Sequence, residues 1–233
     1  MIADERGVFL RGDSVGLLTA RFLDTDAVVT PVTSNTAAEL CGLFDKVYRS
    51  RVGSPYVIEG MQTAARDGFR RVVGFEANGG VLLGSSLAIE GRQVEALPTR
   101  DAMLPILAVL GMAAKQGVTI SALQDSLPRR YTRSGRIEHV DAAVSAPFLQ
   151  GLLDTAGRQD FFAEIGAVTE SDAVDGVRVK LDSGEVVHYR ASGNAPELRC
   201  YAEAASEERA EAILQWGLER AESALQSRQA VRG

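Results

Sequence analysis

The sequence is poor in cysteine and histidine, with two of each among 233 residues. Cys41 and Cys200 stand far apart and match no metal-ligand spacing, so reduced thiols are the simpler interpretation. His188 alternates with apolar residues in the stretch EVVHYR, which is typical of a strand, and His139 is interpreted in the same way. The chain therefore offers no pattern of clustered cysteine and histidine ligands.

Long apolar runs and an excess of basic residues are also absent. No run approaches the ~20 apolar residues that a transmembrane helix needs, and the acidic start MIADERGVFLRGD lacks the apolar core of a signal peptide. The formal net charge of −6 argues against a general nucleic-acid binder, which shows a basic footprint. We therefore expect a cytoplasmic protein with no membrane or nucleic-acid partner. This charge is still compatible with a local cationic pocket for a small anion.

What the sequence does contain is an alternation of strand-like and helix-like segments. In the N-terminal half, for example, a strand is expected at 70–76 and helices at 54–68 and 99–117. Ser54 is expected to cap the first of these helices. This rhythm predicts an α/β/α layered domain with a mostly parallel sheet over residues 1–118.

The pattern changes after Gly117. Several strands surround two glycine-centred turns, at 175–176 and 183–184, and a long amphipathic helix follows at 207–228. Strands flanked by helices without strict alternation predict a smaller α+β domain over residues 119–233. The fold class of the whole chain is therefore predicted to be α/β.

Arg190 lies at the junction of two predicted strands, in the stretch RASGNAPELRC. The simplest interpretation is a turn, because Gly, Asn and Ser favour tight turns and Pro196 ends a strand ladder. The alternative is a cradle for an anion, in which Gly193 lets backbone N–H groups approach a ligand closely. Ser192 and Asn194 would add donors to the Arg190 guanidinium, which can bind phosphate through two parallel hydrogen bonds. These residues alone leave both interpretations open.

A second candidate is GFEANGG, residues 74–80, which directly follows a predicted parallel strand. Ligands of open α/β sheets bind beyond the carboxyl ends of the strands. Glu76 could accept hydrogen bonds from vicinal sugar hydroxyls, Asn78 could donate and accept, and Gly79 permits close approach. The competing interpretation is a glycine-rich hairpin with a solvated glutamate. The nearby stretch TRDA, 99–102, is interpreted as the cap of the long helix with an acid in its first turn.

Three stretches taken together, DAVVTPVTSNTAAE, GFEANGG and RASGNAP, resemble the α-D-phosphohexomutase family, in particular its bacterial phosphomannomutase/phosphoglucomutase group. The resemblance spans essentially the whole chain, in the same order and with similar intervals. Members of the family have four domains, and this chain resembles the third and the fourth. The resemblance favours the anion cradle over the simple turn at residues 190–194.

The resemblance implies a role for the mid-chain loop in binding a sugar. Glu76 stands where the family has its sugar-binding glutamate, with Asn78 and Gly79 in the same loop. The loop departs from the family pattern in two places, because Asn78 replaces a frequent serine and Gly80 a frequent histidine. Ser54 stands where some members have a histidine that helps to hold the substrate.

The resemblance also implies that the C-terminal loop binds phosphate. Arg190, Ser192 and Gly193 match the phosphate-binding loop of the family. Asn194 replaces the frequent threonine, and its amide can still donate a hydrogen bond to a phosphate oxygen.

The chemistry of the family needs two further parts. A phosphoserine exchanges its phosphoryl group with a hexose phosphate by way of a hexose 1,6-bisphosphate, beside a Mg²⁺ ion held by an Asp-rich loop. This sequence contains neither the phosphoserine loop nor an Asp-Gly-Asp stretch, so we expect no catalytic and no metal-binding residue in it.

On this interpretation the chain is the C-terminal portion of a mutase and is inactive alone. Its expected partners are a hexose phosphate, of mannose or glucose, and the N-terminal domains of the same enzyme. The alternative function is a standalone, non-catalytic module that binds sugar phosphates.

Overall fold

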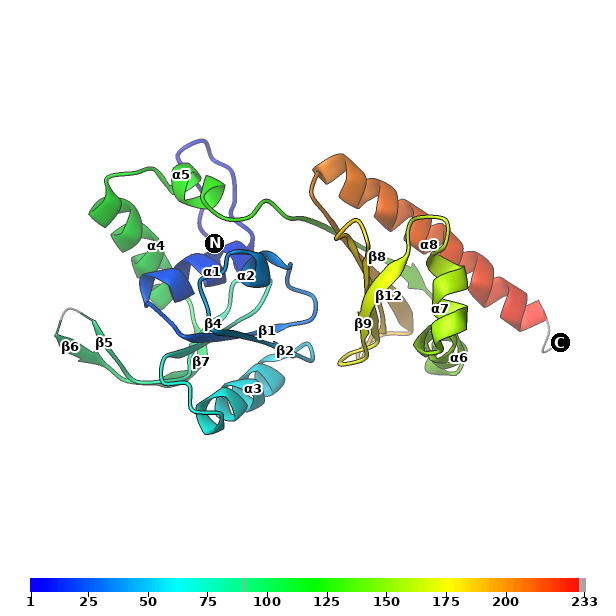
Figure 1. Cartoon of the computed structure of the whole chain (residues 1–233), viewed down its shortest axis with the longest axis horizontal. Helices are drawn as coiled ribbons and strands as arrows, with labels where there is room; N and C mark the ends of the chain where they lie inside the picture. Colours follow the sequence, from blue (N-terminus) through cyan, green and yellow to red (C-terminus); the bar gives the residue numbers. More distant parts are fainter. Residues whose placement is uncertain (90, 231–233) are drawn as a thin grey trace. The chain divides into compact units, whose positions relative to one another are not determined.

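The computed structural model describes residues 1–89 and 91–230, and the chain divides into two compact units, Met1–Arg129 and Arg130–Gly233 (Figure 1). The expected boundary at residue 118 lies earlier than this division. The segment between the two points belongs to the first unit, because helix α5 (Ile120–Asp125) buries Leu123 in the core of that unit.

The first unit is built on a five-stranded sheet in the order β2-β1-β3-β4-β7. Its strands are β1 (Ala27–Pro31), β2 (Lys46–Ser50), β3 (Val72–Phe75), β4 (Val81–Leu83) and β7 (Leu97–Asp101). β1 pairs in parallel with β2 and β3, whereas β4 pairs antiparallel with β3 and β7. The sheet is therefore mostly parallel, with β4 running against its neighbours. β5 (Leu87–Ile89) and β6 (Arg92–Val94) form a separate hairpin.

Helices cover both faces of this sheet, as expected for an α/β/α arrangement (Figure 1). They are α1 (Gly12–Phe22), α2 (Ala37–Leu40), α3 (Ser54–Arg66) and α4 (Met103–Gln116). One core contains Leu17 of α1 and Val109 of α4, and a second core contains Val57 and Met61 of α3. Strands β1 and β3 are buried along their whole length, which explains their continuous apolar sequence.

Two local expectations in this unit are wrong in detail. The helix expected at 99–117 begins only at Met103, because residues 97–101 pair with β4 as strand β7. The N-cap of α3 is Gly53, with φ +126°, and not Ser54, which is the first residue of the helix and has a hydroxyl that hydrogen-bonds away from the helix start. That hydroxyl is directed to another side chain, described below.

The second unit has an antiparallel five-stranded sheet in the order β8-β12-β11-β10-β9. Its strands are β8 (Tyr131–Glu138), β9 (Val168–Asp172), β10 (Val177–Leu181), β11 (Val186–Ala191) and β12 (Glu197–Ala204). Its helices are α6 (Ala142–Leu153), α7 (Thr155–Phe162) and α8 (Glu207–Ala230). The expected combination of an α/β/α unit with an α+β unit is confirmed.

The core of the second unit is aromatic. Tyr189 of β11 makes edge-to-face contacts with Phe148 of α6 and Phe161 of α7, at centroid distances of 5.4 and 5.9 Å. Side chains alternate along a strand, so His188 and Arg190, on either side of Tyr189, point to the opposite face of the sheet.

His188 lies on a strand as expected, but His139 lies beyond the end of β8 with φ +60°. None of the described helices is both long and apolar enough to span a membrane.

Candidate functional site

Residues 76–80, the Glu76 loop, turn sharply at the carboxyl end of β3. Gly79 N–H donates to the Glu76 carbonyl, and Glu76 N–H donates to the Gly80 carbonyl, both at 2.9 Å. Gly79 has φ +91°, a conformation that favours glycine. Asn78 is exposed, and its Oδ1 accepts the Gly80 N–H at 3.0 Å. The loop is thus a tight β3–β4 hairpin turn that presents Asn78 to solvent.

The start of α1 supports this turn from beneath. A Cβ atom built on Gly12 would collide with the Gly79 nitrogen and the Ala77 carbonyl oxygen. Only a glycine at position 12 allows the helix to approach the backbone of the Glu76 loop so closely. The conformation of the loop therefore depends on a residue far away in the sequence.

The Glu76 side chain is buried, which rules out the solvated glutamate of the competing interpretation. Glu76 is 4% exposed. Its Oε2 accepts the Ser54 hydroxyl at 3.0 Å and the Arg100 Nε–H at 2.9 Å, and Arg100 Nη2 lies 2.8 Å away. Burying a carboxylate is costly unless it is paired and hydrogen-bonded. Arg100 and Ser54 provide that pairing.

Residues 190–196, the Arg190 loop, connect β11 to β12. Ser192 N–H donates to the Glu197 carbonyl at 2.9 Å and closes the loop. The stretch from Gly193 to Pro196 is exposed, and a Cβ atom on Gly193 would meet nothing within 4 Å. The loop is therefore a turn with open space beside Gly193 at its tip.

Arg190 itself lies beneath this exposed tip. Its side chain is 11% exposed, and its Nε–H donates to Asp175 Oδ2 at 3.2 Å. The Arg190 Nη1 atom is buried and has no hydrogen-bond partner among the described residues. An unsatisfied donor of this kind is costly, especially on a charged group. The guanidinium is thus held at Nε by Asp175, and its Nη1 remains able to donate a hydrogen bond.

The turn before β10 holds Asp175 in place. A Cβ atom on Gly176, where φ is +87°, would collide with the Tyr189 carbonyl oxygen and lie 2.7 Å from Arg190 Cβ. His188 Nε2 lies 2.5 Å from the Asp175 carbonyl oxygen. Burial lowers the pKa of His188 to about 4, so the ring is neutral near pH 7 and donates from Nε2.

Three arginines form a row across three neighbouring strands near this loop. The strand register pairs Arg190 with Arg199, and Arg199 with Arg136. Glu197 lies between them, 2.6 Å from Arg199 and 3.5 Å from Arg136. The hydrogen bond from Arg199 lowers the pKa of Glu197. Each cation of the row therefore has an acidic neighbour in the absence of a ligand.

The structure groups the predicted residues into two clusters, one in each unit. Glu76, Asn78 and Gly79 share the Glu76 loop, and the four predicted phosphate-binding residues share the Arg190 loop. Sequence reasoning missed Arg100, which pairs with Glu76, and Asp175, which pairs with Arg190. Nothing local to either residue signals its partner, because both pairs depend on how the strands align.

Among the described residues, no group of three or more His, Cys, Asp or Glu side chains is placed to hold a metal ion. Glu76 pairs with Arg100 and Asp175 pairs with Arg190, so these carboxylates of the two clusters are already held by cations.

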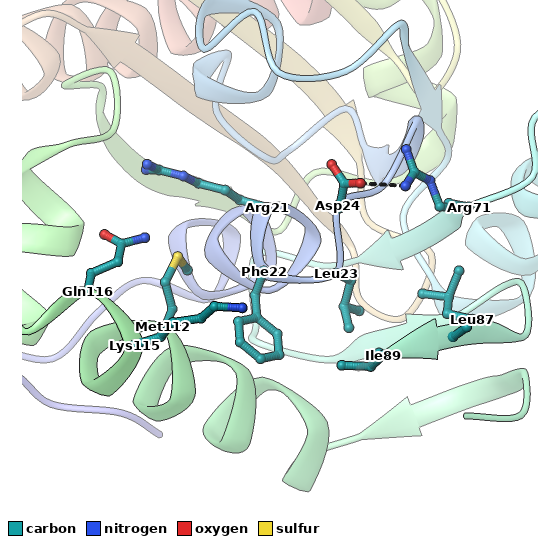
Figure 2. Close-up of a pocket in the computed structure, with 11 residues that line it drawn as sticks. Arg21, Phe22, Leu23, Asp24, Arg71, Leu87, Ile89, Met112, Lys115 and Gln116 are labelled. Atoms are coloured by element: carbon teal, nitrogen blue, oxygen red, sulfur yellow. Dashed lines mark hydrogen bonds and ion pairs between the residues drawn. The ribbon is translucent and has the colours of Figure 1, made fainter. Parts of the chain in front are cut away.

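A cavity of about 330 Å³ lies elsewhere in the first unit (Figure 2). It is bounded by the end of α1, by β5 and by the end of α4, with apolar walls that include Phe22, Ile89 and Met112. Arg71 and Asp24 form an ion pair at its edge. None of the predicted binding residues lines this cavity, so it is separate from both loops.

Two family profiles match the chain. Residues 11–131 match the profile described as phosphoglucomutase/phosphomannomutase, alpha/beta/alpha domain III. Residues 150–215 match the profile of the phosphoglucomutase/phosphomannomutase C-terminal domain. These matches contain the Glu76 loop and the Arg190 loop, respectively.

Individual relatives agree with the profiles. A phosphomannomutase of Sinorhizobium fredii is 44% identical over 223 residues, which cover 94% of this chain and 46% of the relative. A phosphomannomutase of Salmonella muenchen is 43% identical over 89% of this chain and 43% of its own length. The chain thus spans somewhat less than half the length of these relatives.

Solved structures share the fold at lower identity. A phosphoglucomutase/phosphomannomutase family protein from Burkholderia thailandensis superposes with a TM-score of 0.66 at 19% identity, over 94% of this chain and 43% of that one. An N-acetylphosphoglucosamine mutase of Aspergillus fumigatus, in complex with GlcNAc-6P and magnesium, gives a TM-score of 0.64 at 18% identity, over 94% and 48%.

Proposed function

This chain belongs to the phosphoglucomutase/phosphomannomutase family, and from that premise we propose that it is the substrate-holding part of a hexose-phosphate mutase. The reaction would interconvert hexose 1-phosphate and hexose 6-phosphate through a phosphoserine and a hexose 1,6-bisphosphate. Two relatives named phosphomannomutase, at 44% and 43% identity, support a hexose phosphate as the ligand.

The observation that carries the proposal is the buried, unpartnered Nη1 of Arg190. A phosphate oxygen would supply the missing acceptor, and a charge-assisted bond to phosphate is stronger than a neutral one. Ser192 is half-buried and Asn194 is exposed in the same loop, and the Asn194 N–H lies 3.4 Å from the Ser192 hydroxyl oxygen. The open space around Gly193 allows the loop to adjust to the anion. These residues would hold the phosphate that does not react.

The Glu76 loop would bind the sugar. Carboxylate oxygens accept hydrogen bonds from hydroxyl groups, and Asn78 can donate and accept beside them. Such contacts do not involve the reacting phosphate. They can therefore serve a hexose 1-phosphate and a hexose 6-phosphate alike.

The chemistry assigned to this chain is binding and orientation. In phosphoryl transfer most of the catalytic effect comes from positioning and from neutralising charge. Magnesium would supply charge neutralisation in the complete enzyme, but the residues of these two loops do not form a set of metal ligands. We therefore propose that the chain alone has no mutase activity.

The test is an NMR titration of the chain with mannose 6-phosphate and, separately, with inorganic phosphate. Mannose 6-phosphate is expected to shift amide signals in both loops, and inorganic phosphate those of the Arg190 loop alone. Arg190→Met, which keeps the hydrophobic stem and removes the charge, should abolish the phosphate response. Lys180→Met is the matched control, because Lys180 lies on the same sheet and pairs with Glu170. Unchanged spectra at tens of millimolar ligand would refute the proposal.

The second candidate function is a non-catalytic sugar-phosphate binding module. Such a module would hold its ligand with the same two loops and would carry out no phosphoryl transfer. Both candidates predict the same binding and no mutase activity of the chain alone, so an activity assay tests the inactivity that they share. Interconversion of mannose 1-phosphate and mannose 6-phosphate by the purified chain, lost in Arg190→Met, would contradict the proposed inactivity.

A further inference from the structure

Arg100 lies near the end of β7, an edge strand of the sheet, shortly before α4. β4 pairs with β7 at Val81 with Asp101 and at Leu83 with Leu97, and the register shifts between these pairs. Irregularities of this kind redirect a side chain and are common beside functional sites. Asp101, the next residue, accepts the N–H groups of the first turn of α4, at 2.7 and 3.2 Å. The strand irregularity and this cap together set the direction of Arg100.

Arg100 and Ser54 both contact the same carboxylate oxygen, Glu76 Oε2. Arg100 Nε donates to Glu76 Oε2 and to Ser54 Oγ, both at 2.9 Å, and Arg100 Nη2 lies 2.8 Å from the same Oε2. The Ser54 hydroxyl also lies 3.0 Å from Oε2. None of these contacts uses Glu76 Oε1. The Glu76 side chain is 5% exposed whereas that of Arg100 is 55% exposed, so the pair links the interior to the surface.

A glycine in the Glu76 loop makes room for the arginine. A Cβ atom on Gly80 would lie 3.2 Å from Arg100 Cγ and 3.4 Å from Arg100 Cδ. The aliphatic stem of Arg100 therefore lies directly across the loop. The arginine is part of the wall of the candidate sugar site and not a distant surface residue.

We infer that Arg100 is a positioning residue of the sugar site, which keeps Glu76 as an oriented carboxylate and leaves its Oε1 to accept a hydroxyl of the ligand. The inference rests on the proposed function, because the ligand class is the polyhydroxylated ring of a hexose phosphate. A buried carboxylate without a cation would be strongly disfavoured. A carboxylate held at only one oxygen retains acceptor capacity at the other. The arrangement meets both requirements at once.

The experiment is a double-mutant cycle on the full chain, with mannose 6-phosphate as the probe. Its variants are Arg100→Met, Glu76→Gln and the two combined, and Arg100→Lys tests rescue by a different cation. Binding is followed through the amide signals of residues 77–80, and the free energy of unfolding through denaturant titration. Arg92→Met is the matched control, because Arg92 is an exposed arginine on the β5–β6 hairpin of the same unit.

Arg100→Met and Glu76→Gln are each expected to weaken the response of residues 77–80 about tenfold, the effect of losing one charged hydrogen bond. The combined variant should be no weaker than Glu76→Gln alone, because Arg100 acts through Glu76. Arg100→Lys should recover part of the affinity. The combined variant should also recover stability lost in Arg100→Met, since no buried charge is then left unpaired.

Different outcomes separate this inference from the proposed function. If the natural sequence does not bind mannose 6-phosphate at all, the proposed function fails and the inference fails with it. If the natural sequence binds and Arg100→Met binds equally well, only the inference fails. Additive losses in the combined variant would also overturn it, because they would mean that Arg100 acts independently of Glu76.

Discussion

Asp175 holds the Arg190 guanidinium across two neighbouring strands, with its Oδ2 atom 3.2 Å from Arg190 Nε. Asp175 precedes β10, and Arg190 lies near the end of β11. The pair occupies one side of the guanidinium and leaves the buried Nη1 on the other. The candidate anion site is therefore pre-oriented in the absence of an anion.

Asp175→Asn should destabilise the second unit by about 1–3 kcal/mol, because it leaves a buried cation without its counter-charge. Added phosphate should restore part of this loss, since a ligand that binds only the folded state stabilises it by mass action. Thermal unfolding with and without inorganic phosphate measures both effects. A variant as stable as the natural chain, with an unchanged response to phosphate, would show that Asp175 does not position Arg190.

His188 should make the stability of the chain depend on pH. Burial lowers its pKa from 6.5 to about 4, so the folded state disfavours the protonated ring. The unfolded chain binds more protons between these values, and stability is therefore lost as the pH falls from 6.5 to 4. The loss attributable to this ring is roughly 3 kcal/mol.

The measurement is the free energy of unfolding at several pH values, in the natural chain and in His188→Gln. The difference between the two proteins isolates the histidine from carboxylates that titrate at the lower end of the range. Parallel pH curves would contradict the assignment of a buried neutral ring.

Gly12→Ala should distort the Glu76 loop. The added Cβ atom would collide with backbone atoms of Ala77 and Gly79. Backbone atoms cannot move aside as the end of a flexible side chain can. We expect a destabilisation of about 1–3 kcal/mol and shifted amide signals at residues 76–80. Gly111→Ala is the matched control, because that glycine lies within α4 and its Cβ would meet only Phe22, at 3.4 Å. Gly111→Ala should be neutral or slightly stabilising. Equal effects of the two substitutions would refute the packing argument.

Cys200 should be unreactive in the folded protein. Burial raises the pKa of its thiol to about 12, so very little thiolate forms near pH 8. Burial also raises the pKa of Cys41, but that residue is partly accessible. A thiol reagent should therefore modify Cys41 first and Cys200 only after denaturation. Rapid modification of both thiols in the native protein would contradict the burial of Cys200.

The fold class followed from the sequence because its signals are local. Helical periodicity, alternating strands and glycine-centred turns predicted an α/β unit and an α+β unit, which the structure confirms. The resemblance to the phosphohexomutases rested on short contiguous stretches, and the family profiles confirm it. The direction of β4 and the role of residues 97–101 as a strand were not predicted, because strand pairing depends on tertiary partners.

The sequence by itself determined which stretches form loops with small residues and one charged side chain. Tertiary structure alone decided what each charged side chain contacts. Arg100 looked like part of a helix cap but pairs with Glu76, and Ser54 looked like an N-cap but donates to the same carboxylate. Asp175 looked like an ordinary turn residue but holds Arg190. The physical reason is that a buried charge must find its partner in space, and the sheet brings distant residues together only through its strand order and register.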